Sequence, residues 1–140
     1  MIRKFEKSDI EQVMEIWLET NIKAHSFIDK SYWENNYSFV KDMLPQAEIY
    51  LYEEGDKILG FIGLLDEYIA GIFVREDVQS KGVGKLLLDY VKNFKSKLSL
   101  HVYSKNQKAI NFYFRENFKN ISEQIDENTK EKEILMIWEK

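Results

Sequence analysis

The chain has 140 residues, which fits one domain of ordinary size, and 44% of them are hydrophobic, which allows a substantial core. It has no cysteine, which excludes disulfides and a thiolate nucleophile, and only two histidines, which argues against a histidine-built metal centre. A formal net charge of -4 does not favour nucleic acid as a partner, and no apolar run approaches the ~20 residues of a membrane helix, so we expect a soluble cytoplasmic protein that binds neither nucleic acid nor membrane.

The first half of the chain contains segments of helical and of extended periodicity. These segments predict a strand at 2–5, a helix that includes 10–18, a second helix at 29–43, and strands at 47–53, 57–65 and 68–74. Ser8 or Asp9 would cap the first helix, and Pro45 would end the second. Because the three consecutive strands are joined by short turns, we expect an antiparallel meander and not a doubly wound parallel sheet.

The second half alternates in the same way. It predicts a helix at 84–94, a strand at 98–103, a helix at 107–116, and a final strand pair at 118–125 and 132–138. The predicted order is β-α-α-β-β-β-α-β-α-β-β. Residues 1–140 are therefore expected to form a single α+β domain with a mixed, mostly antiparallel sheet flanked by helices.

A glycine-containing loop, Gln79-Ser80-Lys81-Gly82-Val83-Gly84, joins a predicted strand to a predicted helix. A helix start carries unpaired N–H groups and the positive end of the helix dipole, so it attracts phosphate. A P-loop would need a different spacing and a Gly-Lys-Ser/Thr ending, and a dinucleotide fingerprint would need a third glycine in a parallel unit. The pattern Gln/Arg-x-x-Gly-x-Gly/Ala fits, and the alternative is a helix entry that binds no ligand.

Two segments, taken together, resemble the GNAT superfamily of N-acetyltransferases, and residues 24–28 are similar to some of its small bacterial members. Residues 74–87 resemble the central motif, and residues 106–118 resemble the second motif, Asn-x-x-Ala-x-x-Phe-Tyr-x-x-x-Gly-Phe. The order and spacing of the motifs also match, and the resemblance covers essentially the whole chain. Asn117 stands where a glycine is usual, which is a mild change because asparagine tolerates a left-handed backbone at a helix end.

The resemblance implies that acetyl-CoA is the donor substrate and that no metal takes part. Its pantetheine arm would lie between two diverging strands, and loop amides would hold its pyrophosphate. The residues expected to contact acetyl-CoA are Phe73, Val74, Gln79, Lys81, Gly82, Val83, Gly84, Lys85, Asn106 and Tyr113.

The chemistry that the resemblance implies is direct attack of an amine on the thioester. Tyr113 would act as general acid toward the thiolate leaving group, and its alternative role is core packing. The backbone N–H of Val74 or a neighbour would stabilise the developing oxyanion. The base is open: Glu67 or Asp66, at the start of the third meander strand, and His25 are tentative candidates, and Tyr68 lies near the same position. A solvated turn and a structural histidine are the alternatives, and His101 is expected to be a structural residue on a strand face.

The expected function is an acetyl-CoA-dependent N-acetyltransferase that acts on a primary amine of a small molecule, amino acid or peptide. The alternative is a catalytically inactive acyl-CoA-binding sensor or interaction module. Because homodimers are common among similar proteins, the resemblance also admits a homodimer. No motif identifies the acceptor.

Overall fold

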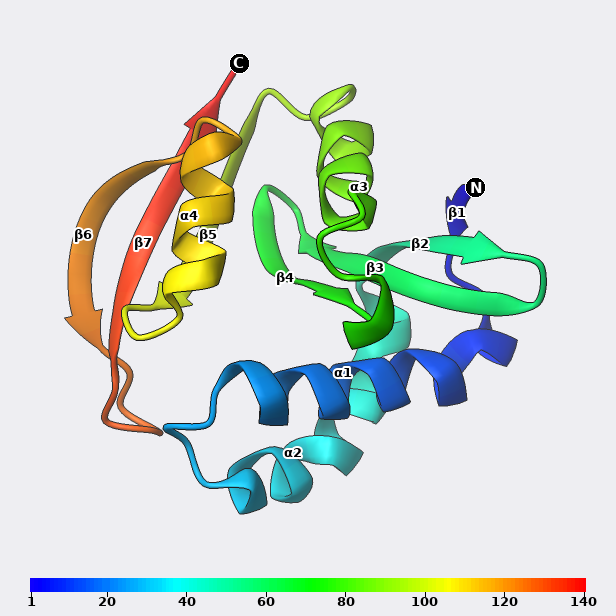
Figure 1. Ribbon diagram of the computed structural model, residues 1–140, viewed down its shortest axis with the longest axis horizontal. Coiled ribbons are helices and arrows are strands. Elements are labelled where there is room, and N and C mark those ends of the chain that lie inside the picture. The colour runs from blue at the N-terminus through cyan, green and yellow to red at the C-terminus, as the bar shows by residue number, and fades with distance from the viewer.

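Seven strands and four helices make up the computed structural model, which describes residues 1–140 (Figure 1). The strands are β1 (Ile2–Lys4), β2 (Glu48–Glu54), β3 (Lys57–Leu65), β4 (Tyr68–Val74), β5 (Lys97–Tyr103), β6 (Lys119–Ile125) and β7 (Lys132–Glu139). The helices are α1 (Ile10–Ala24), α2 (Lys30–Met43), α3 (Val83–Lys92) and α4 (Gln107–Arg115). The elements follow the predicted order, so the α+β class is confirmed.

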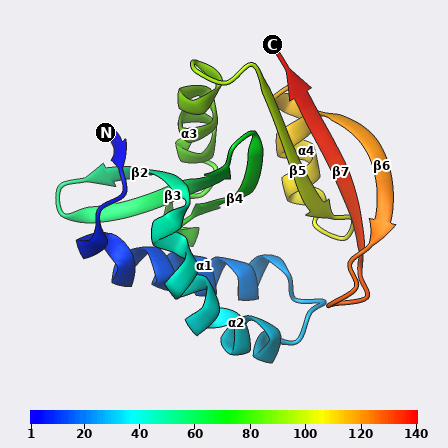
Figure 2. The same cartoon turned by 180° about the vertical axis from the view of Figure 1, so that it is seen from behind.

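All strands belong to one sheet, in the order β1-β2-β3-β4-β5-β7-β6. Neighbouring strands are antiparallel except β4 and β5, which are parallel and share the single residue pair Tyr68–Ser99. There the amide of Ser99 donates a hydrogen bond of 2.9 Å to the carbonyl of Glu67. Beyond this pair the two strands diverge, as both views show (Figures 1 and 2). The sheet is therefore mixed and mostly antiparallel, as predicted, and it opens in its middle.

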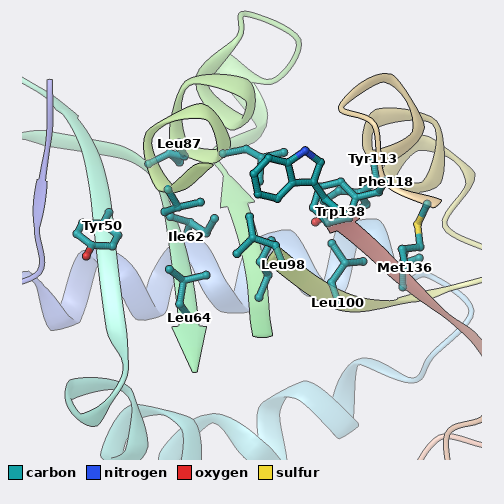
Figure 3. Close-up of a cluster of buried hydrophobic side chains, with 14 of the residues drawn as sticks. Tyr50, Ile62, Leu64, Leu87, Leu98, Leu100, Tyr113, Phe118, Met136 and Trp138 are labelled. Atoms are coloured by element: carbon teal, nitrogen blue, oxygen red, sulfur yellow. The ribbon is translucent and has the colours of Figure 1, made fainter. Parts of the chain in front are cut away.

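Helices cover both faces of the sheet, and each face has its own hydrophobic core. On the face of α1 and α2, the largest contributions come from Val13, Met14, Ile16, Trp17, Trp33, Ile49, Leu51, Ile58 and Phe61. On the face of α3 and α4 they come from Ile62, Leu64, Leu87, Leu88, Leu98, Leu100, Tyr113, Phe118, Met136 and Trp138 (Figure 3). Along β2, Ile49 and Leu51 contribute to the first core and Tyr50 to the second, because successive residues of a strand point to opposite faces of the sheet.

The starts of α1 and α2 are capped in different ways. Asp29 caps α2 by accepting a hydrogen bond of 3.0 Å from the amide of Ser31. Asp9 does not cap α1: its carboxylate, 6% exposed, accepts two bonds of 2.8 and 2.9 Å from the guanidinium of Arg3. A short 3-10 turn, Lys7–Asp9, precedes α1 instead. No helix has the length and the apolar character needed to cross a membrane.

Candidate active site

A cleft of about 520 Å³ lies beyond the ends at which β4 and β5 diverge. Its walls are the second half of α1, the segment that follows β4 and the segment that follows β5. The lining residues are Ile16, Glu19, Thr20, Lys23, Ala24, Arg75, Glu76, Gln79, Lys105, Asn106, Gln107 and Lys108. Four of these side chains are cationic and two are anionic, which suits an anionic ligand.

The glycine loop brings a run of free amides to the start of α3. The amides of Val78 and Gln79 donate to carbonyls in the preceding turn, and the first bond of the helix runs from the amide of Leu86 to the carbonyl of Gly82. The amides of Ser80 to Lys85, which lie between, have no backbone acceptor. At a helix start such amides form an anion site. The loop therefore has the form that the sequence predicts for a phosphate cradle.

The two glycines of the loop serve different purposes. Gly82 has a φ of 89°, in the left-handed region, and a Cβ there would meet nothing within 4 Å, so the backbone angle and not a lack of space favours this glycine. A Cβ on Gly84 would lie 3.6 Å from the ring of Phe112 and 3.8 Å from Val74, which are ordinary contacts. Position 84 therefore accepts alanine sterically, in agreement with the Gly/Ala of the pattern.

The side chains of the loop are already engaged within the protein. The amide nitrogen of Gln79 donates a bond of 2.9 Å to the carbonyl of Val74, and its oxygen accepts from Lys108 at 3.1 Å. The Nζ of Lys85 lies 3.1 Å from Asp89 and 3.2 Å from Glu116. Hydrogen bonds to these carboxylates raise the pKa of Lys85. At position 85 it is the backbone amide that remains free, while Lys81 is exposed.

The open edge of β4 is set by its register with β3. The amide of Arg75 donates to the carbonyl of Leu59 at 2.8 Å, and the following register pairs are Gly60–Val74 and Phe61–Phe73. Because hydrogen-bonded and non-bonded pairs alternate in an antiparallel ladder, the backbone of Phe73 faces β3 and that of Val74 faces the opening. Pairing of an acyl-CoA arm with the backbone of Phe73 does not fit this register, whereas Val74 fits it, as does Ile72 one alternation earlier.

Tyr113 lies in the core between α4 and the sheet, with 8% of its surface exposed. Its ring packs edge-on against Phe112 and Phe118 at centroid distances of 5.2 and 5.4 Å. Burial raises the pKa of Tyr113, the nearby phenol of Tyr68 raises it further, and no protein group hydrogen-bonds its hydroxyl. The phenol is therefore protonated at neutral pH and has a proton to donate.

The end of α4 holds Tyr113 in place through the unusual Asn117. Asn117 has a φ of 72°, and its amide donates to the carbonyl of Phe114 at 3.1 Å. The amide of Phe118 donates to the carbonyl of Tyr113 at 2.9 Å. These two bonds and the contact between the rings of Phe118 and Tyr113 make up a Schellman motif. The prediction that asparagine adopts the left-handed conformation here is confirmed.

Asn106 and His25 form one unit at the edge of the cleft. The side-chain oxygen of Asn106 accepts from the amide of Ala109 at 3.2 Å and thereby caps α4. Its NH₂ group consequently faces Nε2 of His25, at 3.3 Å, and donates to it. The proton of the neutral imidazole is thus assigned to Nδ1, which is buried without a partner.

The surroundings of His25 favour a structural role over that of a base. The ring stacks on Trp33 at 5.3 Å and meets Tyr103 edge-on at 5.2 Å. Burial lowers the pKa of His25 to about 4, so it is a weak proton acceptor at neutral pH. Glu67, the other base candidate, is exposed in the turn between β3 and β4, and its backbone carbonyl accepts the hydrogen bond from the amide of Ser99.

The contact between Tyr68 and His101 was not predicted from the sequence, although Tyr68 itself was considered near the position of the base. The hydroxyl of Tyr68 lies 2.8 Å from Nδ1 of His101, which joins the start of β4 to β5 where the strands begin to part. His101 was expected to be a structural strand residue. The one signal in the sequence was the alternation along β5, which puts Ser99, His101 and Tyr103 on the same face of the sheet.

Residues 10–118 match the Acetyltransferase (GNAT) family. The chain belongs to this family. The peptidyl-lysine N-acetyltransferase YiaC of Escherichia coli is 34% identical over 99% of this GNAT chain and 96% of its own length. The family, together with relatives that are named N-acetyltransferases, identifies the chain as an N-acetyltransferase.

Solved GNAT structures have the same fold. The solution structure of apo YjaB from Escherichia coli superposes with a TM-score of 0.87 at 23% identity, covering 99% of this GNAT chain and 96% of the other. The structure of the acetyltransferase YncA from Salmonella typhimurium with its cofactor acetyl-CoA gives 0.70 at 16% identity, covering 99% and 92%. At these identities the likeness supports the fold.

Proposed function

We propose that this GNAT protein transfers an acetyl group from acetyl-CoA to a primary amine by direct attack, and that the amine is the side chain of a lysine in a peptide or protein. The observation that carries the proposal is the divergence of β4 from β5 next to the free amides of Ser80 to Lys85. An extended ligand arm that ends in a pyrophosphate matches both features at once.

The donor would bind by completing contacts that the protein leaves open. The backbone of Val74 faces the opening and can pair with the amides of a pantetheine arm, as an added strand would. The free amides and the helix dipole of α3 favour a pyrophosphate at the loop. Asn106 already caps α4 and contacts His25, so one remaining N–H of its side chain is available to the arm.

The transfer step assigns one task to each of two groups. The amine nitrogen attacks the carbonyl carbon, and a β4 N–H that faces the opening, that of Ile72 or Val74, would stabilise the oxyanion while the other pairs with the arm. As the carbon–sulfur bond breaks, Tyr113 gives its proton to the thiolate and recovers one from solvent. The buried, protonated state of Tyr113 supports this role.

A lysine acceptor is supported by the relatives and by charge. Three curated relatives carry the name peptidyl-lysine N-acetyltransferase, one of them at 34% identity. A net charge of -4 favours a cationic acceptor. The lysine must lose its ammonium proton before it attacks, so a base or a water chain has to be present at the acceptor side.

Calorimetry with acetyl-CoA and a thiol-release assay with a lysine-containing peptide test the proposal. Tyr113→Phe is expected to lower turnover by ~10²-fold while the affinity for acetyl-CoA changes less than about twofold, because only the proton donor is removed. Tyr90→Phe is the matched control, since Tyr90 is an aromatic residue on α3 that packs against Tyr50 and Phe94.

The outcomes separate the alternatives. Absence of saturable acetyl-CoA binding at micromolar protein would refute the donor assignment. Binding without transfer to any of a panel of amines would favour the acyl-CoA-binding sensor. Wild-type turnover in Tyr113→Phe would remove Tyr113 from the chemistry.

A further inference from the structure

Glu133 is a half-buried acidic residue at the start of β7, next to the turn of the chain's last hairpin. No hydrogen bond or ion pair engages its carboxylate, whereas neighbouring carboxylates are paired. Lys105 lies 3.1 Å from Glu131, and Lys132 lies 3.7 Å from Glu123. A carboxylate that no cation of the protein engages is free to attract one from outside the protein.

The sheet register places Glu133 on the face covered by α1 and α2. Glu133 lies directly opposite Tyr103 in the antiparallel pair of β5 and β7, and Tyr103 packs in the core of that face. His101, two residues before Tyr103, is a diagonal neighbour of Glu133. Diagonal positions lie roughly 7–8 Å apart, within reach of long side chains.

The charge of Glu133 acts on two tyrosine hydroxyl groups. Tyr68 contacts His101, and Tyr32 extends from the first turn of α2. Burial raises the pKa of Tyr68, and the negative charge of Glu133 raises it further. Burial, Asp126 and Glu133 together raise the pKa of Tyr32. Glu133 therefore acts electrostatically on tyrosines from two different elements, β4 and α2.

The turn between β6 and β7 continues the acidic character toward the surface. It contains three acidic residues, Asp126, Glu127 and Glu131, against one cation of its own, Lys130, and Glu131 is paired with Lys105. The turn lies beside the connection of α1 and α2 (Figures 1 and 2). An ammonium group is attracted by such a rim, and it is stabilised by a carboxylate among aromatic faces.

We propose that Glu133 is the residue that binds the ammonium group of the acceptor, in a pocket formed with Tyr32, Tyr68 and His101. The proposal rests on the transfer reaction proposed above and names the acceptor side of the same site. Tyr113 packs in the core on the other face of the sheet, and the phenol of Tyr68 contributes to its raised pKa. The acceptor thus enters on the face of α1 and α2, and the leaving thiolate is protonated from the face of α4.

Glu133→Gln tests the proposal, because it keeps the shape of the side chain and removes the charge. The KM for a lysine peptide is expected to rise about tenfold to a hundredfold, while calorimetry gives an unchanged affinity for acetyl-CoA. Glu139→Gln is the matched control: it makes the same change on the same strand and face, at the exposed far end of β7. Thermal melts show whether each variant is folded.

A binding measurement makes the test independent of turnover. With the protein saturated by CoA, a lysine peptide should bind the wild type about tenfold more tightly than the same peptide with norleucine, and Glu133→Gln should bind the two alike. Equal preference for lysine in Glu133→Gln and wild type would overturn the proposal, whether or not transfer occurs. Lack of transfer by a wild type that still prefers lysine would instead refute the proposed reaction and leave the ammonium site standing.

Discussion

The buried His25 makes a pH-dependent contribution to stability that can be measured. Its pKa falls from 6.5 to about 4 on folding because burial disfavours the charged imidazolium. The unfolded chain therefore binds more protons between these values, and stability is lost as the pH drops from about 6.5 toward about 4. The loss should not occur at higher pH, where the ring is neutral in both states.

The size of the effect follows from the two pKa values. Between about pH 7 and pH 5, the proton linkage of a single histidine with this shift costs roughly 2 kcal/mol of unfolding free energy. His25→Phe keeps an aromatic ring beside Trp33 and Tyr103 and removes the titrating group. Any constant loss caused by the missing bond to Asn106 cancels when each protein is compared with itself at the two pH values.

Urea denaturation of both proteins at the two pH values is the assay. The wild type should lose about 2 kcal/mol more than His25→Phe over this interval. Carboxylates contribute the same slope to both proteins and do not affect the difference. The same pair of measurements on His101→Gln identifies which of the two histidines is responsible. Parallel pH profiles for wild type and His25→Phe would show that the ring is not held neutral, and a role as base would then regain support.

Two further predictions concern backbone geometry. Gly82→Ala should lower the free energy of unfolding by roughly 1 kcal/mol, because the φ of 89° is unfavourable for alanine, and it should weaken acetyl-CoA binding. Gly84→Ala should leave the free energy of unfolding unchanged or stabilise α3. Urea denaturation and calorimetry of the two variants check the contrast, and equal losses would contradict it. Asn117→Ala should lower the melting temperature by about 2–4 °C, while Asn117→Gly should leave it unchanged or raise it. A thermal melt followed by circular dichroism measures both changes. An unchanged melting temperature for Asn117→Ala would mean that the left-handed conformation at position 117 does not affect stability.

The sequence was sufficient for features that depend on neighbours along the chain. The periods of β3 and β4 predicted both strands to the residue, and the left-handed conformation of Asn117 followed from the usual glycine at that position. The free amides of the loop follow from the simple fact that a helix begins after it. These features depend on local backbone sterics and hydrogen bonding.

The acceptor side could not be predicted in the same way. The pocket proposed for it combines Tyr32, Tyr68, His101 and Glu133, which come from four different elements, and such a combination depends on strand register and on the point at which β4 and β5 pair. Asp9 illustrates the same limit: it looked like a helix cap, but tertiary contact with Arg3 uses its carboxylate. Long-range geometry decides both cases.

The parting of β4 from β5 also has a consequence for the lifetime of the protein. The strands β1 to β4 and the strands β5 to β7 meet at one residue pair, so the interior of the sheet contains two unsatisfied edges. A bound arm that bridges these edges would stabilise the folded state by about 2.7 kcal/mol at a hundred times its Kd. The fraction of molecules open to proteases would then fall by about a hundredfold. Abundance of the protein would thus follow the cellular supply of acetyl-CoA.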